Sequence, residues 1–127
     1  MTDMRTPLGK VRGLGSAKDG TEHFWRQRLT AFANIPLTIF FVGLIIALNG
    51  AEYATVKAAL SNPFVALLTM GAILSALYHM KLGMQVVIED YVHTEGTKFL
   101  LVMLNTLFCA ALGLISVFAL MKLAFAA

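Results

Sequence analysis

The chain has 127 residues, of which 58% are hydrophobic and only 13% are charged, and its mean hydropathy is +0.76. Soluble domains carry about 25% charged residues, so a chain this short and this apolar has no interior in which to hide its apolar surface from water. The composition therefore excludes an ordinary soluble domain and predicts a single integral membrane domain. The formal net charge is +3, and the ten Lys and Arg residues are clustered along the chain.

Residues 1–28 form a polar segment ahead of the first apolar stretch. Up to residue 22, glycines are interleaved with basic residues, a composition that favours an extended or disordered segment. Two interpretations stay open here: a solvated tail that only supplies positive charge, or a strap that lies on a soluble partner. Phe24 and Trp25, beside Arg26 and Arg28, are typical of a helix end at the membrane–water interface, so Trp25 is predicted to be an interface anchor.

Three stretches without a charged residue predict three transmembrane helices. They run from residue 29 to 51, from 58 to 80 and from 99 to 121, and each is 23 residues long. A helix needs about 20 apolar residues to cross the hydrocarbon core, and backbone groups in lipid must be paired within the segment. With helix-start signals included, the expected spans are about 29–50, 63–88 and 99–121. Residues 29–127 are thus predicted to be an all-α membrane domain of three transmembrane helices.

Local signals predict how these spans are connected. Asn62 followed by Pro63 is a typical helix cap and first-turn pair, and it places the start of the second span. Residues 50–61 are predicted to form a short surface helix. Gly96 is predicted to make the turn before the third span.

The basic residues predict the orientation. With three spans, the N-terminus and the second loop share one side, and that side carries eight Lys and Arg residues: Arg5, Lys10, Arg12, Lys18, Arg26, Arg28, Lys81 and Lys98. The other side carries only Lys57 and Lys122. The side with more positive charge is cytoplasmic, so the N-terminus is expected in the cytoplasm. Since the first 28 residues lack the apolar core of a cleavable signal peptide, we expect the first span to direct insertion into a bacterial inner membrane.

His79 is the one ionisable residue well inside a predicted span. Such a residue is costly in lipid and is interpreted as functional by default. Few partners for it are evident within this chain. Three roles stay open: a metal ligand, since neutral imidazole suits haem iron, a hydrogen bond between helices, or a proton relay.

Gly83 and Asp90 lie on the same predicted helix face as His79. Gly83 is four residues further on, where the absence of a side chain would let a flat macrocycle approach the backbone. Asp90 is eleven residues from His79, which returns to within about 20° of its direction and lies about 16 Å further toward the cytoplasm. Tyr91 follows at the helix end, where its phenol is either a hydrogen-bond donor to a ligand or an interface tyrosine.

Arg28 and Cys109 are two further residues with reactive or charged side chains. Arg28 is the last charge before the first span, where its guanidinium would either pair with a carboxylate or propionate or act as a positive anchor. Cys109 is the only cysteine, which excludes a disulfide or a thiolate metal site within this chain.

The order His79, Gly83 and Asp90-Tyr91 resembles the signature of the smaller of the two membrane-anchor subunits of succinate dehydrogenase. Arg28-Leu29-Thr30-Ala31 is similar to the Arg-x-Thr-Ala sequence at the start of that family's first helix. The stretch through Trp25-Arg26-Gln27-Arg28 resembles alphaproteobacterial members in particular. The resemblance covers nearly the whole chain.

The resemblance implies a role for each matching residue. His79 would be an axial ligand of haem b, with the second axial histidine supplied by the other, larger membrane anchor. Tyr91 would hydrogen-bond a ubiquinone carbonyl with support from Asp90, and Arg28 would lie near the haem propionates. Some relatives carry Trp two residues after the histidine where this chain has Lys81, so the packing around that position differs.

The resemblance implies an anchor of succinate:ubiquinone oxidoreductase, respiratory complex II. Its partners would be the flavoprotein subunit, the iron–sulfur subunit, the second membrane anchor and the lipid bilayer, and no nucleic acid. The chain has no Gly-rich dinucleotide fingerprint and no cluster-binding cysteines, so none of its residues is expected to catalyse succinate oxidation.

Two alternatives remain at this stage. One is a cofactor-free structural subunit or assembly factor in which His79 only bonds a neighbouring helix. The other is the anchor of a quinol:fumarate reductase, in which the same residues would serve electron flow in the opposite direction.

Overall fold

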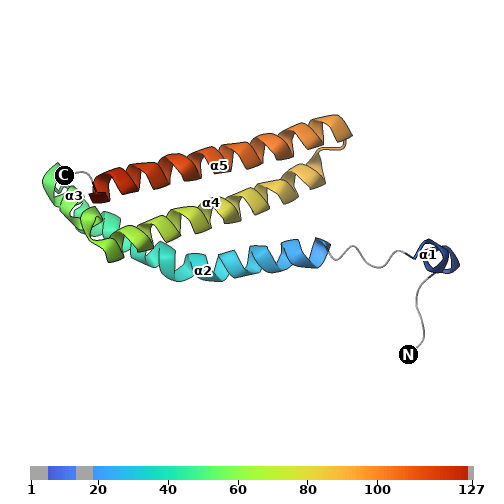
Figure 1. Ribbon diagram of the computed structural model, residues 1–127, viewed down its shortest axis with the longest axis horizontal. Coiled ribbons are helices and arrows are strands. Elements are labelled where there is room, and N and C mark those ends of the chain that lie inside the picture. Colours follow the sequence, from blue (N-terminus) through green and yellow to red (C-terminus); the bar gives the residue numbers. More distant parts are fainter. Residues whose placement is uncertain (1–5, 14–18, 126–127) are drawn as a thin grey trace, which may run out of the picture.

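The computed structural model describes residues 6–13 and 19–125, and the regular structure of these residues is helical. The elements are α1 (Pro7–Arg12), α2 (Asp19–Leu48), α3 (Tyr53–Ser61), α4 (Pro63–Tyr91) and α5 (Glu95–Phe125). Three helices, α2, α4 and α5, are long and apolar enough to cross a membrane. In Figure 1, α4 lies between α2 and α5, and α3 lies across one end of the three. The predicted all-α membrane fold with three spans is confirmed.

The polar N-terminal part of the chain is more helical than predicted. α1 forms within the segment that was expected to be extended, with the Thr6 side chain accepting a hydrogen bond from the Gly9 amide. α2 begins at Asp19, so the aromatic and basic residues 23–28 belong to the first long helix. Residues 1–5 and 14–18 lie outside the described part, so the choice between a tail and a strap stays open.

The chain turns from α4 into α5 before Gly96 rather than at it. Residues 92–94 connect the helices, and the Lys98 amide already donates to the Thr94 carbonyl at 2.9 Å. Glu95 lies in the first turn of α5, where a carboxylate interacts favourably with the free amides. The prediction of a turn at Gly96 is therefore wrong, because Gly96 is the second residue of the helix.

The predicted helix start at Asn62 and Pro63 is confirmed. Asn62 Oδ1 accepts hydrogen bonds from the amides of Phe64 (3.0 Å) and Val65 (3.4 Å), and Pro63 occupies the first turn of α4. Before it, the expected short helix is present as α3, after a turn in which Gly50 has a φ of 74°, a left-handed conformation that favours glycine.

One stripe of α2 packs against α4. Its half-buried positions recur at alternating intervals of four and three residues, the spacing of helices that pack side by side: His23, Gln27, Thr30, Asn34, Leu37, Phe41, Leu44 and Leu48. The α4 residues at this interface are small. A Cβ on Gly71 would lie 3.9 Å from Leu37, and one on Gly83 would lie 3.5 Å from Gln27. Small residues let two helices approach closely in a membrane.

The α4–α5 interface is built in the same way. A Cβ on Gly113 of α5 would lie 3.5 Å from Leu74 of α4, and Asn105 Nδ2 donates to the Lys81 carbonyl at 2.9 Å. No side chain in the described residues is fully buried, and the outer faces of the helices expose large apolar residues such as Phe32, Ile46 and Phe118. Those faces suit contact with lipid or with other membrane subunits.

Candidate functional site

His79 lies on α4 with its ring half-buried against α2. Its Nδ1 is 2.9 Å from the hydroxyl oxygen of Thr30, a residue 49 positions earlier in the chain. Few partners were expected for His79 within this chain, and Thr30 is the one hydrogen-bond partner that the described residues supply, because α2 brings it to the level of the imidazole. A hydrogen bond between helices is thus present at His79, and it uses only one of the two ring nitrogens.

The other ring nitrogen is free. His79 Nε2 makes no hydrogen bond to the described residues. Three buried side-chain atoms lack a partner there, namely His23 Nε2, Gln27 Oε1 and Thr69 Oγ1, and because His79 Nε2 is not among them, it is not fully buried. Nε2 therefore retains access to the surface of the chain. Neutral imidazole is a good donor to haem iron, so the donor chemistry fits an axial ligand.

At the end of the α2–α4 interface where α2 begins, Thr30 contacts His79, and Gln27 and His23 follow on the same α2 stripe; we call these four residues the polar cluster. His23 Nε2 and Gln27 Oε1 are buried in it without a hydrogen-bond partner in the described residues. Gln27 also covers Gly83, because a Cβ there would lie 3.5 Å from Gln27 Nε2. The Gln27 side chain is therefore the group of this chain that lies close to Gly83. The close approach of a flat macrocycle to the Gly83 backbone stays a prediction.

Asp90 and Tyr91 are the last two residues of α4, which continues without interruption from His79. Both are exposed, Tyr91 to 78%, and neither side chain makes a hydrogen bond within the described residues. At 1.5 Å per residue, Asp90 lies about 16 Å along the helix from His79. The two predicted sites therefore occupy one helix at different depths, and the fold does not bring them into contact.

Arg28 points away from the polar cluster. Its guanidinium lies over the Phe24 ring, 5.1 Å from the centroid, on the exposed side of α2. Arg26 is the α2 cation that reaches α4: it pairs with Glu22, and its Nη1 lies 3.5 Å from the Tyr78 hydroxyl. Pairing of Arg28 with a propionate stays a prediction.

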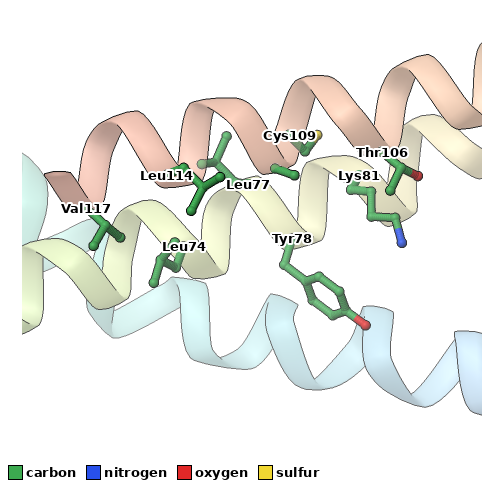
Figure 2. A pocket seen from close by; sticks show the side chains of 10 residues that line it. Leu74, Leu77, Tyr78, Lys81, Thr106, Cys109, Leu114 and Val117 are labelled. Carbon is green, nitrogen blue, oxygen red and sulfur yellow. The ribbon is translucent and has the colours of Figure 1, made fainter.

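A groove of about 460 Å³ lies between α4 and α5. Most of its lining is aliphatic, and Figure 2 shows the side chains of Tyr78 and Lys81 extending from α4 toward α2 at one end. Lys81 Nζ lies 5.9 Å from the Tyr78 ring centroid, within the range of a cation–π contact. Lys81 therefore places its aliphatic stem in the groove and its ammonium beside Tyr78.

The described residues contain no group of three or more His, Cys, Asp or Glu side chains that would hold a metal ion. His79 is therefore not part of such a ligand group within the described residues.

Sequence reasoning did not identify Thr30 as a partner of His79. It also did not identify Gln27 as the residue that lies against Gly83, or Tyr78 as the α4 residue that Arg26 contacts. The signal for the first two was available, since His23, Gln27, Thr30 and Asn34 are polar residues at intervals of four, three and four. A polar stripe at this spacing at the start of an apolar helix indicates a polar helix–helix contact. No spacing pattern of this kind in the sequence indicated that Tyr78 contacts α2.

The fold and the site define a class of protein: a small helical membrane subunit with three spans that presents one accessible imidazole nitrogen from within a span. The chain matches the family of succinate dehydrogenase/fumarate reductase transmembrane subunits over residues 2–114, and it belongs to that family.

Its relatives narrow the class further. It is 31% identical to the succinate dehydrogenase hydrophobic membrane anchor subunit of Rickettsia bellii over 106 residues, which are 84% of this chain and 85% of the relative. It is 30% identical to the protein of the same name from Paracoccus denitrificans over 118 residues, 93% of this chain and 91% of the relative. The resemblance to succinate dehydrogenase anchors is confirmed, and the chain is a membrane anchor that associates with other succinate dehydrogenase subunits.

Proposed function

We propose that this anchor supplies one axial ligand of a haem b through His79, and part of a ubiquinone-reduction site through Tyr91 and Asp90. The second axial ligand would come from the second membrane anchor, and the flavoprotein and iron–sulfur subunits would dock on the cytoplasmic face. One observation carries the haem proposal: an imidazole within a span has its Nδ1 engaged by Thr30, while its Nε2 makes no hydrogen bond to the described residues. When bound, haem b supplies a one-electron store beside the route to the quinone.

Tyr91 and Asp90 would act at the quinone end of the protein. Ubiquinone takes up two electrons and two protons as it is reduced to ubiquinol. The Tyr91 phenol would donate a hydrogen bond to a quinone carbonyl oxygen and orient the ring, and Asp90 beside it would support the phenol and exchange protons with interfacial water. Both side chains are exposed and without hydrogen-bond partners in the described residues, so both are available to a ligand at an interface with another chain.

The proposal includes a location in a bacterial inner membrane with the N-terminus in the cytoplasm. The start of α2 and the α4–α5 connection lie at the same end of the long helices (Figure 1). Arg26, Arg28 and Lys98 belong to segments at that end, and the excess of Lys and Arg that the sequence assigns to this side favours the cytoplasm. Tyr91 and Asp90 lie at this end, where docked soluble subunits would deliver electrons.

A Tyr91→Phe variant of the purified complex tests the quinone part of the proposal. Succinate oxidation with a water-soluble acceptor is expected to persist, while ubiquinone reduction falls by at least about tenfold, because one hydrogen bond to the reacting oxygen is lost. Tyr53→Phe is the matched control, since Tyr53 is also exposed but lies on α3 at the opposite end. Equal ubiquinone reduction in Tyr91→Phe and wild type would remove Tyr91 from the mechanism.

A His79→Ala variant tests the haem part. The reduced-minus-oxidised spectrum is expected to lose or change its b-type bands, because Nε2 would no longer be available to the iron. His93→Ala is the control, since His93 is exposed in the connection after α4. An unaltered spectrum in His79→Ala would place the ligand elsewhere.

A cofactor-free structural subunit is the second candidate, and the Thr30–His79 contact is the observation that favours it, because that bond alone gives His79 a structural use. Purification separates the two. Haem absorbance that follows this chain through each step supports the ligand proposal, and a colourless, fully assembled complex supports the structural role.

A further inference from the structure

We infer that Thr30 is a positioning residue for His79: it fixes the imidazole with its proton on Nδ1 and so presents the Nε2 lone pair to a metal. This inference rests on the proposed role of His79 as a haem ligand and adds a residue on a different helix to it. The contact that carries it joins Thr30 Oγ1 to His79 Nδ1 at 2.9 Å.

The neighbours of Thr30 indicate which group, the Thr30 hydroxyl or His79 Nδ1, donates the hydrogen in this contact. Besides His79, Thr30 Oγ1 has two neighbours, the carbonyl oxygens of Arg26 at 2.9 Å and of Gln27 at 3.0 Å. A carbonyl oxygen only accepts, and a hydroxyl has one hydrogen to donate. The Thr30 hydrogen therefore points back to its own helix, as is common for threonine in helices. With that hydrogen directed to its own helix, the Thr30 oxygen offers a lone pair to His79, and in the inferred arrangement His79 Nδ1 is the donor.

The tautomer follows from this direction. A neutral imidazole carries one proton, so a proton on Nδ1 leaves Nε2 with a lone pair. The two nitrogens lie on different sides of the ring, and Nδ1 points toward α2, so Nε2 points away from it. A histidine ligand whose second nitrogen donates a hydrogen bond is held in one tautomer and one orientation, and its ligating nitrogen becomes more basic.

The position of Thr30 on a packed stripe makes this contact rigid. Thr30 and Gln27 belong to the α2 stripe that faces α4, and Gln27 lies against Gly83, one turn beyond His79. The hydroxyl is thus held at a fixed height by helix packing. A more basic Nε2 favours ferric over ferrous iron, so this hydrogen bond is expected to lower the midpoint potential of the haem.

Thr30→Val, in the purified complex, removes the hydroxyl and retains the branched shape. We expect the haem midpoint potential to rise by up to about 59 mV, which corresponds to a tenfold change for a one-electron couple. Haem occupancy is expected to fall as well, since the loss of such a supporting group costs about 10- to 100-fold in metal affinity. Thr30→Ser retains the hydroxyl and should restore the wild-type potential. Thr30→Ala is a second variant without the hydroxyl if Thr30→Val assembles poorly.

Thr106→Val is the matched control. Thr106 Oγ1 donates to the Val102 carbonyl at 3.0 Å in the same intrahelical manner, but it contacts no histidine. A wild-type potential in this control, together with shifted potentials in Thr30→Val and Thr30→Ala, supports the inference. Wild-type potential and occupancy in both Thr30 variants, or a Thr30→Ser variant that is shifted as far as they are, would overturn it.

The His79→Ala spectrum separates this inference from the proposal beneath it. If His79→Ala changes the haem spectrum and the Thr30 variants do not change the potential, only the positioning role fails. If His79→Ala leaves the spectrum unaltered, the ligand role fails and the positioning role fails with it.

Discussion

The two halves of the α2–α4 interface share one spacing but differ in chemistry. At the end where α2 begins, the stripe carries His23, Gln27 and Thr30. Thr30 faces His79 of α4, and Gln27 faces Gly83. At the other end the same stripe carries apolar side chains such as Leu37, Phe41, Leu44 and Leu48, which lie close to Gly71, Thr69 and Ala72. Packing is thus continuous along the helix pair. Polar side chains are concentrated in one half, and Thr69 is the buried polar residue that lies in the other half.

The difference shows which half is specialised. Lipid is as apolar as leucine, so the apolar half is held by close packing of small and large residues, which is enough to hold two helices together. Buried polar atoms in the other half cost free energy unless they are paired. Two of them, His23 Nε2 and Gln27 Oε1, are unpaired within the described residues. Thr69 Oγ1 in the apolar half is unpaired in the same way, so what distinguishes the polar half is the Thr30–His79 hydrogen bond.

Phe41→Ala is expected to have the largest effect on stability, because it removes a ring from the apolar half. Phe41 is half-buried and lines the grooves on both sides of this contact. We expect the complex to lose about 3 kcal/mol of stability, the lower range for such truncations, with no change in the haem spectrum. Thermal unfolding in detergent measures the loss, with Ile46→Ala on the exposed face as the control. A lost haem band at unchanged stability would show that the halves are not functionally distinct.

Gly83→Leu is expected to have an intermediate effect on stability and a large one on haem content. A Cβ at Gly83 would lie in ordinary contact with Gln27 Nε2, at 3.5 Å, so the longer leucine side chain must displace the Gln27 amide, one helical turn from the Thr30–His79 bond. Overpacking of this kind costs about 1–3 kcal/mol. Haem per complex is measured from the spectrum. Gly43→Leu is the control, since a Cβ there meets no atom within 4 Å. Full haem content in Gly83→Leu would show that this contact does not shape the site.

Gln27→Leu is expected to have the smallest effect. Its Oε1 is buried without a hydrogen-bond partner in the described residues, so removing the amide should leave stability unchanged or raise it by about 1 kcal/mol. Denaturation of the assembled complex measures the change, with Gln85→Leu on α4 as a comparison, because Gln85 Nε2 does donate to Glu89 at 2.8 Å. A clear loss of stability in Gln27→Leu would mean that another chain of the complex donates a hydrogen bond to Gln27.

The sequence by itself determined the three spans and the start of α4. The thickness of the bilayer sets the length of a charge-free stretch, and Asn62 and Pro63 act within one helical turn, so both signals are local. It also singled out His79, because an ionisable group within a span is rare. It failed at Gly96 and at the start of α2, where polar residues continue a helix that the composition alone did not extend.

Only the tertiary structure decided what His79 touches. Three contacts join α2 to α4: the hydrogen bond between Thr30 and His79, the packing of Gln27 against Gly83, and the contact of Arg26 with the Tyr78 hydroxyl. Each depends on how far one helix is rotated and shifted along the other. The packing of both helices together sets that rotation and shift, whereas the residue spacing within one helix sets only which of its own side chains share a face.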